Sequence, residues 1–410
     1  MNYMPLGWID FSKTERNKVL TVLDLLSESG TLDELGIATI RDGFSDLFFP
    51  GTSTIQTRAK YFFIVPYALR DLERSGETNP NRFLSAFDEI ERSCGEVFRQ
   101  NAPDDLGIIG SRSLAGGNWV KRTPADIYWA GLRQYDIFRG GRLSLSEYAR
   151  AVCSMKGKKS NLINLGNRND KAEENEADDR GAGDIRSMHF WNIPTYEPEW
   201  FEQLQMDLTY EEAEFLKSQI AMSCGNSMFA YALKNDLWEM IDCPDFAGLA
   251  EMIHLFPEQM QKDYQLAKDF SEFNYVLRVI YNMVLSDGKN EDANEIFEEL
   301  RPELKNIAGI NLEAVFERTM AQRNPMMCKF LRDTKKAMLE EDTATLKKLV
   351  ENRERLLKGA GRARCAHPGE FDTTAWFGGG RLSYRFGNAK TLMADIYAGE
   401  EESYAKSQWR

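Results

Sequence analysis

Apolar residues recur every three or four positions through most of the chain, which is the spacing of helices that bury one face. Stretches of this kind predict helices over about residues 57–74, 257–285 and 291–300. The longest of them carries Phe270, Phe273, Leu277, Ile280 and Val284 on one side. These aromatic and aliphatic positions indicate a packed core more strongly than they indicate a ligand site.

Helix starts are marked by polar residues just before the apolar stripes. Capping boxes at Ser12–Glu15, Thr31–Glu34 and Thr209–Glu212 each pair a hydroxyl with a carboxylate three residues later. At Asn79-Pro80 and Thr123-Pro124, a capping residue is followed by a proline that suits the first helical position. Helices are therefore predicted to begin at all five places.

The fold class that follows is mainly α and multi-helical, with a few short strands, one of them at Gly107–Ile109. A helix opened by Thr123-Pro124 and a short helix capped by Ser144–Glu147 are joined by a turn at Arg139–Arg142. This arrangement is compatible with a helix-turn-helix or winged-helix-like unit. A generic helical hairpin would give the same pattern and stays open.

Composition divides the chain of 410 residues into four segments. We predict an N-terminal helical domain (1–155), a polar linker or loop (156–185), an acidic helical domain (186–328) and a basic C-terminal region (329–410). The acidic segment holds 11 basic and 25 acidic side chains, whereas the last segment holds 16 basic and 12 acidic ones. An acidic partner would accordingly find its counter-charges near the ends of the chain.

Several classes of protein lack their signals in this sequence. There is no apolar run of membrane-spanning length and no secretory leader pattern, so we expect a cytoplasmic protein without a membrane partner. The six cysteines form no C-x-x-C pair, and hydrolase, metalloprotease, deaminase and dinucleotide-binding motifs are missing. No metal, cofactor or catalytic residue is predicted, and the chain is interpreted as more compatible with a non-enzyme.

The first candidate site lies between Phe48 and Phe63. A Pro-Gly turn leads into three hydroxyl residues and then two cations before a predicted helix, and such a helix start attracts phosphate. The alternative is simple capping, with Arg58 paired to an acid such as Asp42 or Asp46. The residues of this candidate phosphate site are Thr52, Ser53, Thr54, Arg58 and Lys60.

The second candidate lies between Arg353 and Lys390, where basic side chains alternate with aromatic ones. Cations can meet phosphates there while rings stack on bases, as in nucleic-acid binding. The alternative is that these cations dock on the acidic segment of the same chain. The residues assigned to nucleic-acid or phosphate contact, together with one cation before the Thr123-Pro124 helix start, are Arg122, Arg362, Arg364, Arg381, Tyr384 and Arg385.

Particular blocks resemble a bacterial family of unknown function. They are the opening Gly7–Ser12, the run Phe48–Phe63, the stretch Arg122–Leu132, and the ending Leu382–Arg385 with Asp395. The resemblance implies a gene setting among helicases and phage-defence genes, and it implies no activity, cofactor or catalytic residue.

Three functions remain open from the sequence. The first is a non-enzymatic, DNA-associated accessory component of a prokaryotic anti-phage defence system. The second is a protein-protein assembly subunit for a helicase or nuclease partner. The third is a divergent metal-dependent nuclease, because 64 acidic side chains could assemble a metal site in ways the sequence does not localise.

Overall fold

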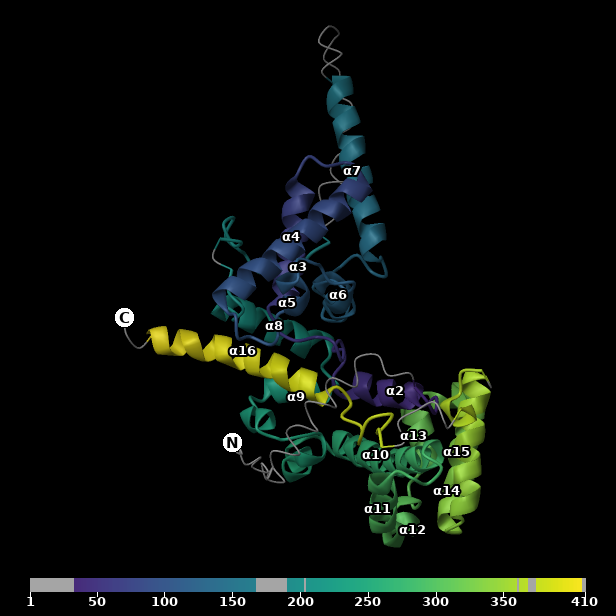
Figure 1. Cartoon of the computed structure of the whole chain (residues 1–410). Helices are drawn as coiled ribbons and strands as arrows, with labels where there is room; N and C mark the ends of the chain where they lie inside the picture. The colour runs from purple at the N-terminus through teal and green to yellow at the C-terminus, as the bar shows by residue number, and fades with distance from the viewer. Residues whose placement is uncertain (1–32, 167–189, 203, 360, 368–373, 408–410) are drawn as a thin grey trace, which may run out of the picture. The chain divides into compact units, whose positions relative to one another are not determined.

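The computed structural model describes residues 33–166, 190–202, 204–359, 361–367 and 374–407. These residues are mostly helical, which confirms the mainly α prediction (Figure 1). Within this part of the chain, β-structure is limited to one isolated antiparallel bridge, between Phe138 and Trp191. The predicted helix start at Ser12–Glu15 lies outside the described residues.

Two compact units make up the chain, and each combines distant segments. The first unit comprises residues 1–45 and 245–384, and the second unit comprises residues 46–244 and 385–410. Helix α7 (Leu145–Gly166) extends into the stretch predicted as a linker. The domain boundaries proposed from composition stay predictions.

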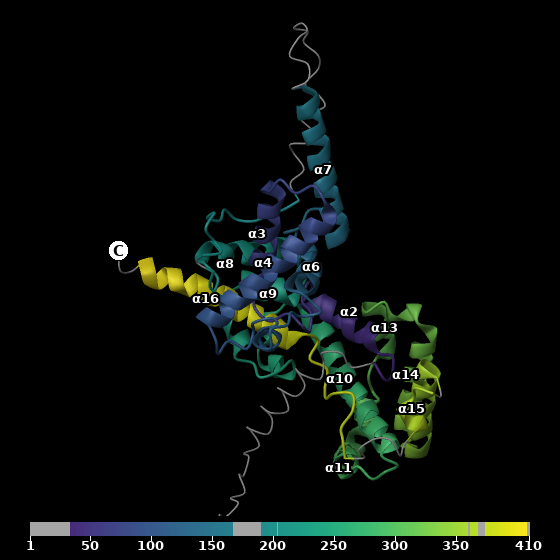
Figure 2. The same ribbon diagram turned by 45° about the horizontal axis from the view of Figure 1, so that its top comes forward.

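In the second unit, α3 packs against α4 and α6, while the C-terminal helix α16 packs along α8 (Figures 1 and 2). Its core is aromatic, with Phe62 edge-on to Tyr128 and close to Tyr135. Its helices are α3 (Tyr61–Arg74), α4 (Pro80–Asn101), α5 (Ser111–Ala115), α6 (Pro124–Gln134), α7, α8 (Tyr210–Ser223), α9 (Met228–Lys234), the 3-10 helix η2 (Trp238–Ile241) and α16 (Phe386–Ser407).

In the first unit, α10 is the central helix, and α11 and α15 pack against it. Helices α14 and α15 form an antiparallel hairpin through the tight turn at 340–342. The elements are α2 (Ala38–Phe48, whose last three residues belong to the second unit), η3 (Ala247–Glu251), η4 (Ile253–Leu255), α10 (Glu258–Leu285), α11 (Glu291–Leu300), η5 (Arg301–Glu303), α12 (Leu304–Ile307), α13 (Leu312–Arg318), η6 (Ala321–Arg323), α14 (Pro325–Leu339), α15 (Thr343–Lys358) and η7 (Arg364–Ala366).

Most predicted caps are present where the sequence put them. The Asn79 side chain accepts hydrogen bonds from the first free amides of α4, and Thr209 forms the predicted capping box with Glu212. Thr123 caps α6 as predicted and also forms a capping box with Asp126. Each cap satisfies amides that have no partner inside the helix. The apolar face of α10 is buried as predicted, Phe270 and Phe273 included.

Four local predictions are wrong. Helix α3 begins at Tyr61 rather than near 57, and α2 begins at Ala38, whose amide donates to the Asp33 carboxylate. Residues 107–109 form a turn instead of a strand, since their backbone bonds to the side chains of Thr57 and Tyr61. Helix α7 is 22 residues long, not short, and the described residues around the α6–α7 pair contain no strand that could form a wing.

Among the described residues, no helix is both long and apolar enough to cross a membrane.

Candidate binding sites

The three hydroxyl residues predicted to open a phosphate site do not cap a helix. Helix α3 starts seven residues after Thr54, and Lys60 at its cap position makes no capping bond through its side chain. The buried Thr52 hydroxyl instead donates to the Phe49 carbonyl over 2.6 Å and closes the Pro-Gly turn. Thr52, Ser53 and Thr54 therefore lie in the turn region before α3 and not at the start of the helix.

The start of α3 nevertheless binds an anion, and that anion belongs to the chain itself. Asp395, from α16, accepts the Ala59 amide over 2.7 Å. The Arg58 Nε lies 2.9 and 3.1 Å from its two carboxylate oxygens. Nearby, the Tyr128 hydroxyl accepts the backbone amides of Thr57 and Arg58. The predicted preference for an oxyanion is thus satisfied within the second unit.

The rest of the Arg58 guanidinium faces two more carboxylates. Asp105 contacts Nη1, and Asp207 contacts Nη2 over 2.9 Å. Burial alone would lower the pKa of Arg58, but the facing Asp395 and Asp105 raise it above its ordinary value. Arg58 is therefore paired with acids, as the alternative held, but these acids are far away in sequence and are neither Asp42 nor Asp46.

Lys60 is also neutralised inside the second unit. Its ammonium donates to Glu212 over 2.7 Å and to the Asp207 carbonyl over 3.2 Å, and the lysine side chain is buried. Glu212 is simultaneously the capping-box carboxylate of α8, so it joins two helices. A phosphate would have to displace a buried carboxylate in order to reach Lys60.

Three of the predicted C-terminal cations are also paired with carboxylates of their own unit. In the first unit, Arg364 pairs with the buried Glu34 over 3.0 Å, and Arg381 pairs with Glu272 over 2.6 Å. Tyr384 is buried and donates to the Ala267 carbonyl, so its ring is not a platform for stacking bases. In the second unit, Arg385 pairs with Asp46 over 2.7 Å and also donates to the Thr52 carbonyl.

Three of the predicted cations are exposed, and one of them, Arg381, pairs with Glu272. Arg122 lies just before α6 and Arg362 lies just after α15, and no carboxylate partner is seen for either one among the described residues. Of the pairs above, only Arg381–Glu272 joins the C-terminal region to the acidic segment 186–328, as the docking alternative required. The carboxylates of the other pairs are spread through the chain.

A solvent-exposed apolar cluster at one end of the α14–α15 hairpin was not predicted. The Arg353 guanidinium lies 5.3 Å from the Phe330 ring, which fixes how the two helices face each other. One turn further toward the open end, Met326 is 56% exposed and Leu356 is 61% exposed. We define the hairpin-end patch as Met320, Met326, Leu356 and Leu357, with Arg323 and Arg362 at its rim.

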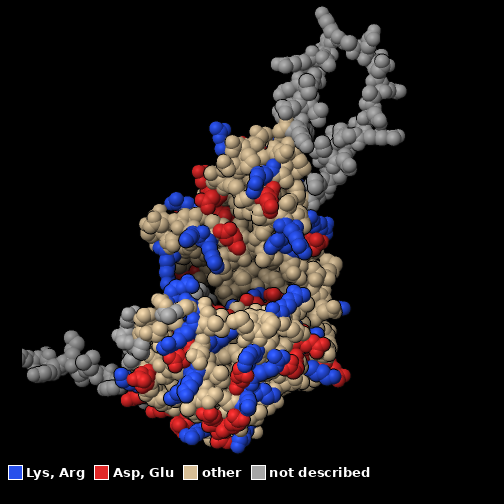
Figure 3. All heavy atoms as spheres, turned by 90° about the vertical axis from the view of Figure 1, so that its right-hand side faces the viewer, with Lys and Arg blue, Asp and Glu red and all other residues tan. Residues whose placement is uncertain are grey.

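The flank of this hairpin differs from its open end. Figure 3 views the chain from the side on which α14 and α15 lie in Figure 1, and there basic and acidic side chains are interspersed. Many of them pair along a helix, as Lys329 does with Asp333 and Arg355 does with Glu351. At the open end, by contrast, Arg323 and Arg362 lack a carboxylate partner among the described residues.

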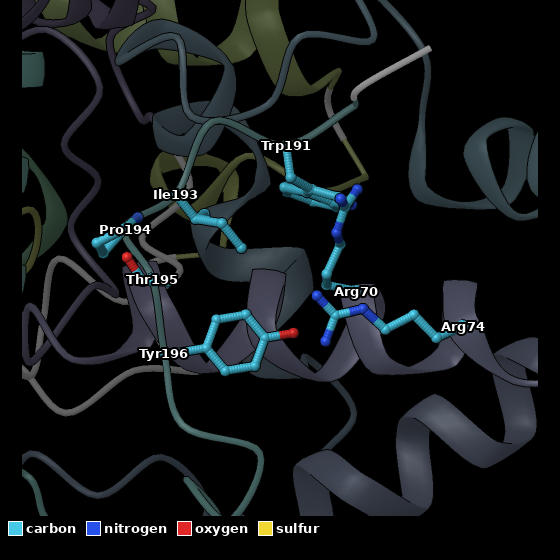
Figure 4. Close-up of a pocket in the computed structure, with 7 residues that line it drawn as sticks. All are labelled: Arg70, Arg74, Trp191, Ile193, Pro194, Thr195 and Tyr196. Atoms are coloured by element: carbon cyan, nitrogen blue, oxygen red, sulfur yellow. The ribbon is translucent and has the colours of Figure 1, made fainter. Parts of the chain in front are cut away.

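A second feature missed from the sequence is a small pocket in the second unit (Figure 4). Arg70 and Arg74 project from one side of α3, opposite a stretch without helix from Trp191 to Tyr196. The i,i+4 spacing of the two arginines and the nearby aromatics were visible signals. They were overlooked because the intervening chain, 75–190, hides that these segments meet.

The described residues contain no group of three or more histidine, cysteine or carboxylate side chains placed to hold a metal ion. The six cysteines are all free thiols, and five of them are buried. The carboxylates around Arg58 are held by guanidinium and amide donors rather than being arranged around an empty position.

These features define a mainly helical protein of two compact units, whose second unit is tied together by internal ion pairs. Residues 1–163 match the sequence profile of a family of unknown function (DUF6361). This match is consistent with the resemblance to an uncharacterised domain. No curated protein and no solved structure matches the chain.

Proposed function

We propose that the chain is a non-enzymatic assembly subunit that binds a partner protein through the hairpin-end patch. The supporting observation is the exposure of Met320, Met326, Leu356 and Leu357 at one end of a helical hairpin, at 55, 56, 61 and 40%. Apolar side chains gathered in this way are typical of interaction sites, whereas single exposed ones are common everywhere. A polar rim around an apolar centre is the usual anatomy of such a surface.

The rim determines which partner would fit. Arg323 and Arg362 place positive charge beside the apolar residues, so a segment with apolar residues on one face and carboxylates on the other would complement the patch. An amphipathic acidic helix lying across the hairpin end has both properties. The proposed partner therefore presents such a helix.

The DNA-associated role ranks below this one. Duplex binding draws its affinity from cations that are free to replace counterions along the phosphates. Arg58, Lys60, Arg364, Arg381 and Arg385 already face carboxylates of their own unit. Among the predicted contacts, only Arg122 and Arg362 are exposed without a carboxylate partner in the described part of the chain, which leaves little charge for a polyanion.

The sequence resemblance indicates in which biological system the proposed assembly subunit would act. A helicase or nuclease of a prokaryotic anti-phage defence system in the cytoplasm is the partner class that the resemblance favours. The fold supports this assignment only in providing a helical scaffold with an exposed docking end.

A designed peptide that mimics the proposed partner helix can test the patch directly. The probe is a fluorescent helical peptide with leucines on one face and glutamates on the other, and a second peptide carries lysines instead. In anisotropy titrations, the acidic peptide should bind the wild-type chain. The double change Met326→Glu and Leu356→Glu should weaken this binding roughly tenfold or more, because apolar contacts are lost and like charges meet.

The matched control is Leu339→Glu, which alters an apolar residue, 43% exposed, at the other end of the same hairpin. Equal weakening by the control, or equal binding of the lysine peptide, would contradict the proposal. A loss of thermal stability in place of a loss of binding would mean that another part of the chain covers the patch. Duplex DNA binding that falls steeply with salt and disappears in Arg122→Ala and Arg362→Ala would favour the DNA-associated role instead.

A further inference from the structure

The pocket between α3 and residues 191–196 has two arginines as its polar wall (Figure 4). Arg70 and Arg74 lie one helical turn apart, so both guanidinium groups reach the same hollow. The hollow has a volume of 290 Å³, which suits a ligand at the small end of the usual range.

Both guanidinium groups have N–H donors that no described residue uses. Arg70 donates from Nη1 to Glu73 over 3.0 Å, and Arg74 lies 3.6 Å from Asp71 and 5.6 Å from the centre of the Tyr196 ring. A guanidinium has five N–H donors in a planar fork that matches two oxygens of a carboxylate or phosphate. Most of this capacity has no partner among the described residues.

Besides these arginines, uncharged donors also bind the two neighbouring carboxylates. Asp71 accepts the Tyr196 hydroxyl over 2.7 Å and the Trp200 indole N–H over 2.8 Å, while Glu73 accepts the Tyr148 hydroxyl over 2.8 Å. These bonds hold the carboxylates in place without using the arginines. The two arginines and the two carboxylates together carry no net charge, so a ligand would be held by directed hydrogen bonds rather than by a strong electrostatic field.

The opposite wall is apolar and fixed. Trp191 is buried and its indole N–H donates to the Tyr148 hydroxyl over 3.0 Å, so the ring is anchored and its donor is already used. Ile193 and Pro194 line the hollow beside it. A ligand in this pocket would meet cationic forks on one side and flat apolar surface on the other.

We propose that this pocket binds a small organic oxyanion, in which a phosphate or carboxylate faces Arg70 and Arg74 and a ring or short apolar group lies near Trp191 and Pro194. This role is separate from the assembly role and uses a different unit. The two anion types share the recognition by guanidinium, and the experiment distinguishes them.

Isothermal titration calorimetry of the full chain, with phenyl phosphate, benzoate, inorganic phosphate and benzyl alcohol as probes, tests the site. At least one of the two ring-bearing anions should bind, and inorganic phosphate should bind more weakly because it lacks the apolar contact. The anion that binds more tightly shows whether the pocket prefers phosphate or carboxylate. Arg70→Gln and Arg74→Gln should each weaken that binding roughly tenfold or more, since each removes charge-assisted hydrogen bonds.

The control is Arg92→Gln, which removes an exposed arginine from a comparable i,i+4 pair with Glu96 on α4. It should bind as the wild type does. The proposal is overturned if neither ring-bearing anion binds at millimolar concentration, if benzyl alcohol binds equally well, or if all three glutamine variants behave alike. Arg74 has a 63% exposed side chain, so Arg74→Gln decides the matter even if Arg70→Gln fails to fold.

Discussion

The two ends of α3 handle arginine in opposite ways. Before its first turn, Arg58 is enclosed by Asp395, Asp105 and Asp207, and its side chain is 18% exposed. In its last turns, Arg70 and Arg74 each have one nearby carboxylate, and that carboxylate is shared with tyrosine or tryptophan. The first arrangement uses arginine to join segments of the second unit, whereas the second leaves donors facing a hollow.

The difference teaches that a basic residue near a helix end does not by itself identify a ligand site. What decides is how many carboxylates the rest of the fold brings to it. An arginine whose guanidinium donors are used by carboxylates of the fold stabilises the fold, whereas an arginine with unused donors is available for binding. The two kinds should respond differently to substitution.

The largest effect is expected from Arg58→Ala. Removal of the guanidinium leaves the buried Asp395 without its cation, and breaking a buried pair in this way costs about 3 kcal/mol of unfolding free energy. Urea denaturation followed by circular dichroism measures the change. Arg92→Ala, in an exposed pair, should change the stability by no more than about 0.5 kcal/mol.

A double-mutant cycle sharpens this test. If Arg58 mainly compensates Asp395, then Arg58→Ala combined with Asp395→Ala should cost clearly less than the sum of the two single changes. Additive costs would mean that the pair is not the connection between α16 and the start of α3.

The next effect concerns Glu91, a buried carboxylate of α4 that is paired with no cation in the part of the chain that the structure describes. It accepts the Ala125 amide over 2.7 Å, and burial raises its pKa to about 8, although that hydrogen bond opposes the rise. The folded state therefore binds the proton more tightly than the unfolded chain, whose pKa lies near 4.5. Its contribution to stability should be fully present below pH 4.5 and be lost as the pH rises toward 8.

Glu91→Gln keeps an acceptor for the Ala125 amide but cannot ionise. Between pH 5 and 6.5, the wild type should lose about 2 kcal/mol more unfolding free energy than this variant, which is measured by denaturation at each pH. Glu96→Gln, on the exposed side of the same helix, should follow the wild type. Parallel curves for Glu91→Gln and the wild type would show that Glu91 is already ionised in the fold.

The sequence predicted the local part of this structure well. Helix starts at Asn79, Thr123 and Thr209 were visible because a cap and its amides are only a few residues apart. The preference for an anion near Arg58 was visible for the same reason. The identity of that anion was not visible, because Asp395 lies 337 residues after Arg58 in the chain.

Exposure was equally hidden from the sequence. Met326 and Leu356 occupy spacings that would suit a buried helix face, and only the folded structure shows that both side chains are exposed. Periodicity shows which side of a helix is apolar, but what covers that side depends on tertiary contacts. The pocket beside α3 depends on such contacts as well.

The smallest effects come from Arg362 and Arg364 in the first unit, two neighbouring cations that the sequence treated alike. Arg364 pairs with the buried Glu34 and lies 4.6 Å from the centre of the Phe377 ring. Glu34 also meets Arg278 and Lys358, so Arg364→Ala leaves it partly compensated and should cost about 1 kcal/mol. Arg362 is exposed and, among the described residues, bonds to the Lys358 carbonyl alone, so Arg362→Ala should stay within about 0.5 kcal/mol. Chemical denaturation of the two alanine variants side by side measures both costs in unfolding free energy. Equal costs would show that the contrast between arginines paired with carboxylates and arginines with unused donors does not extend beyond the second unit.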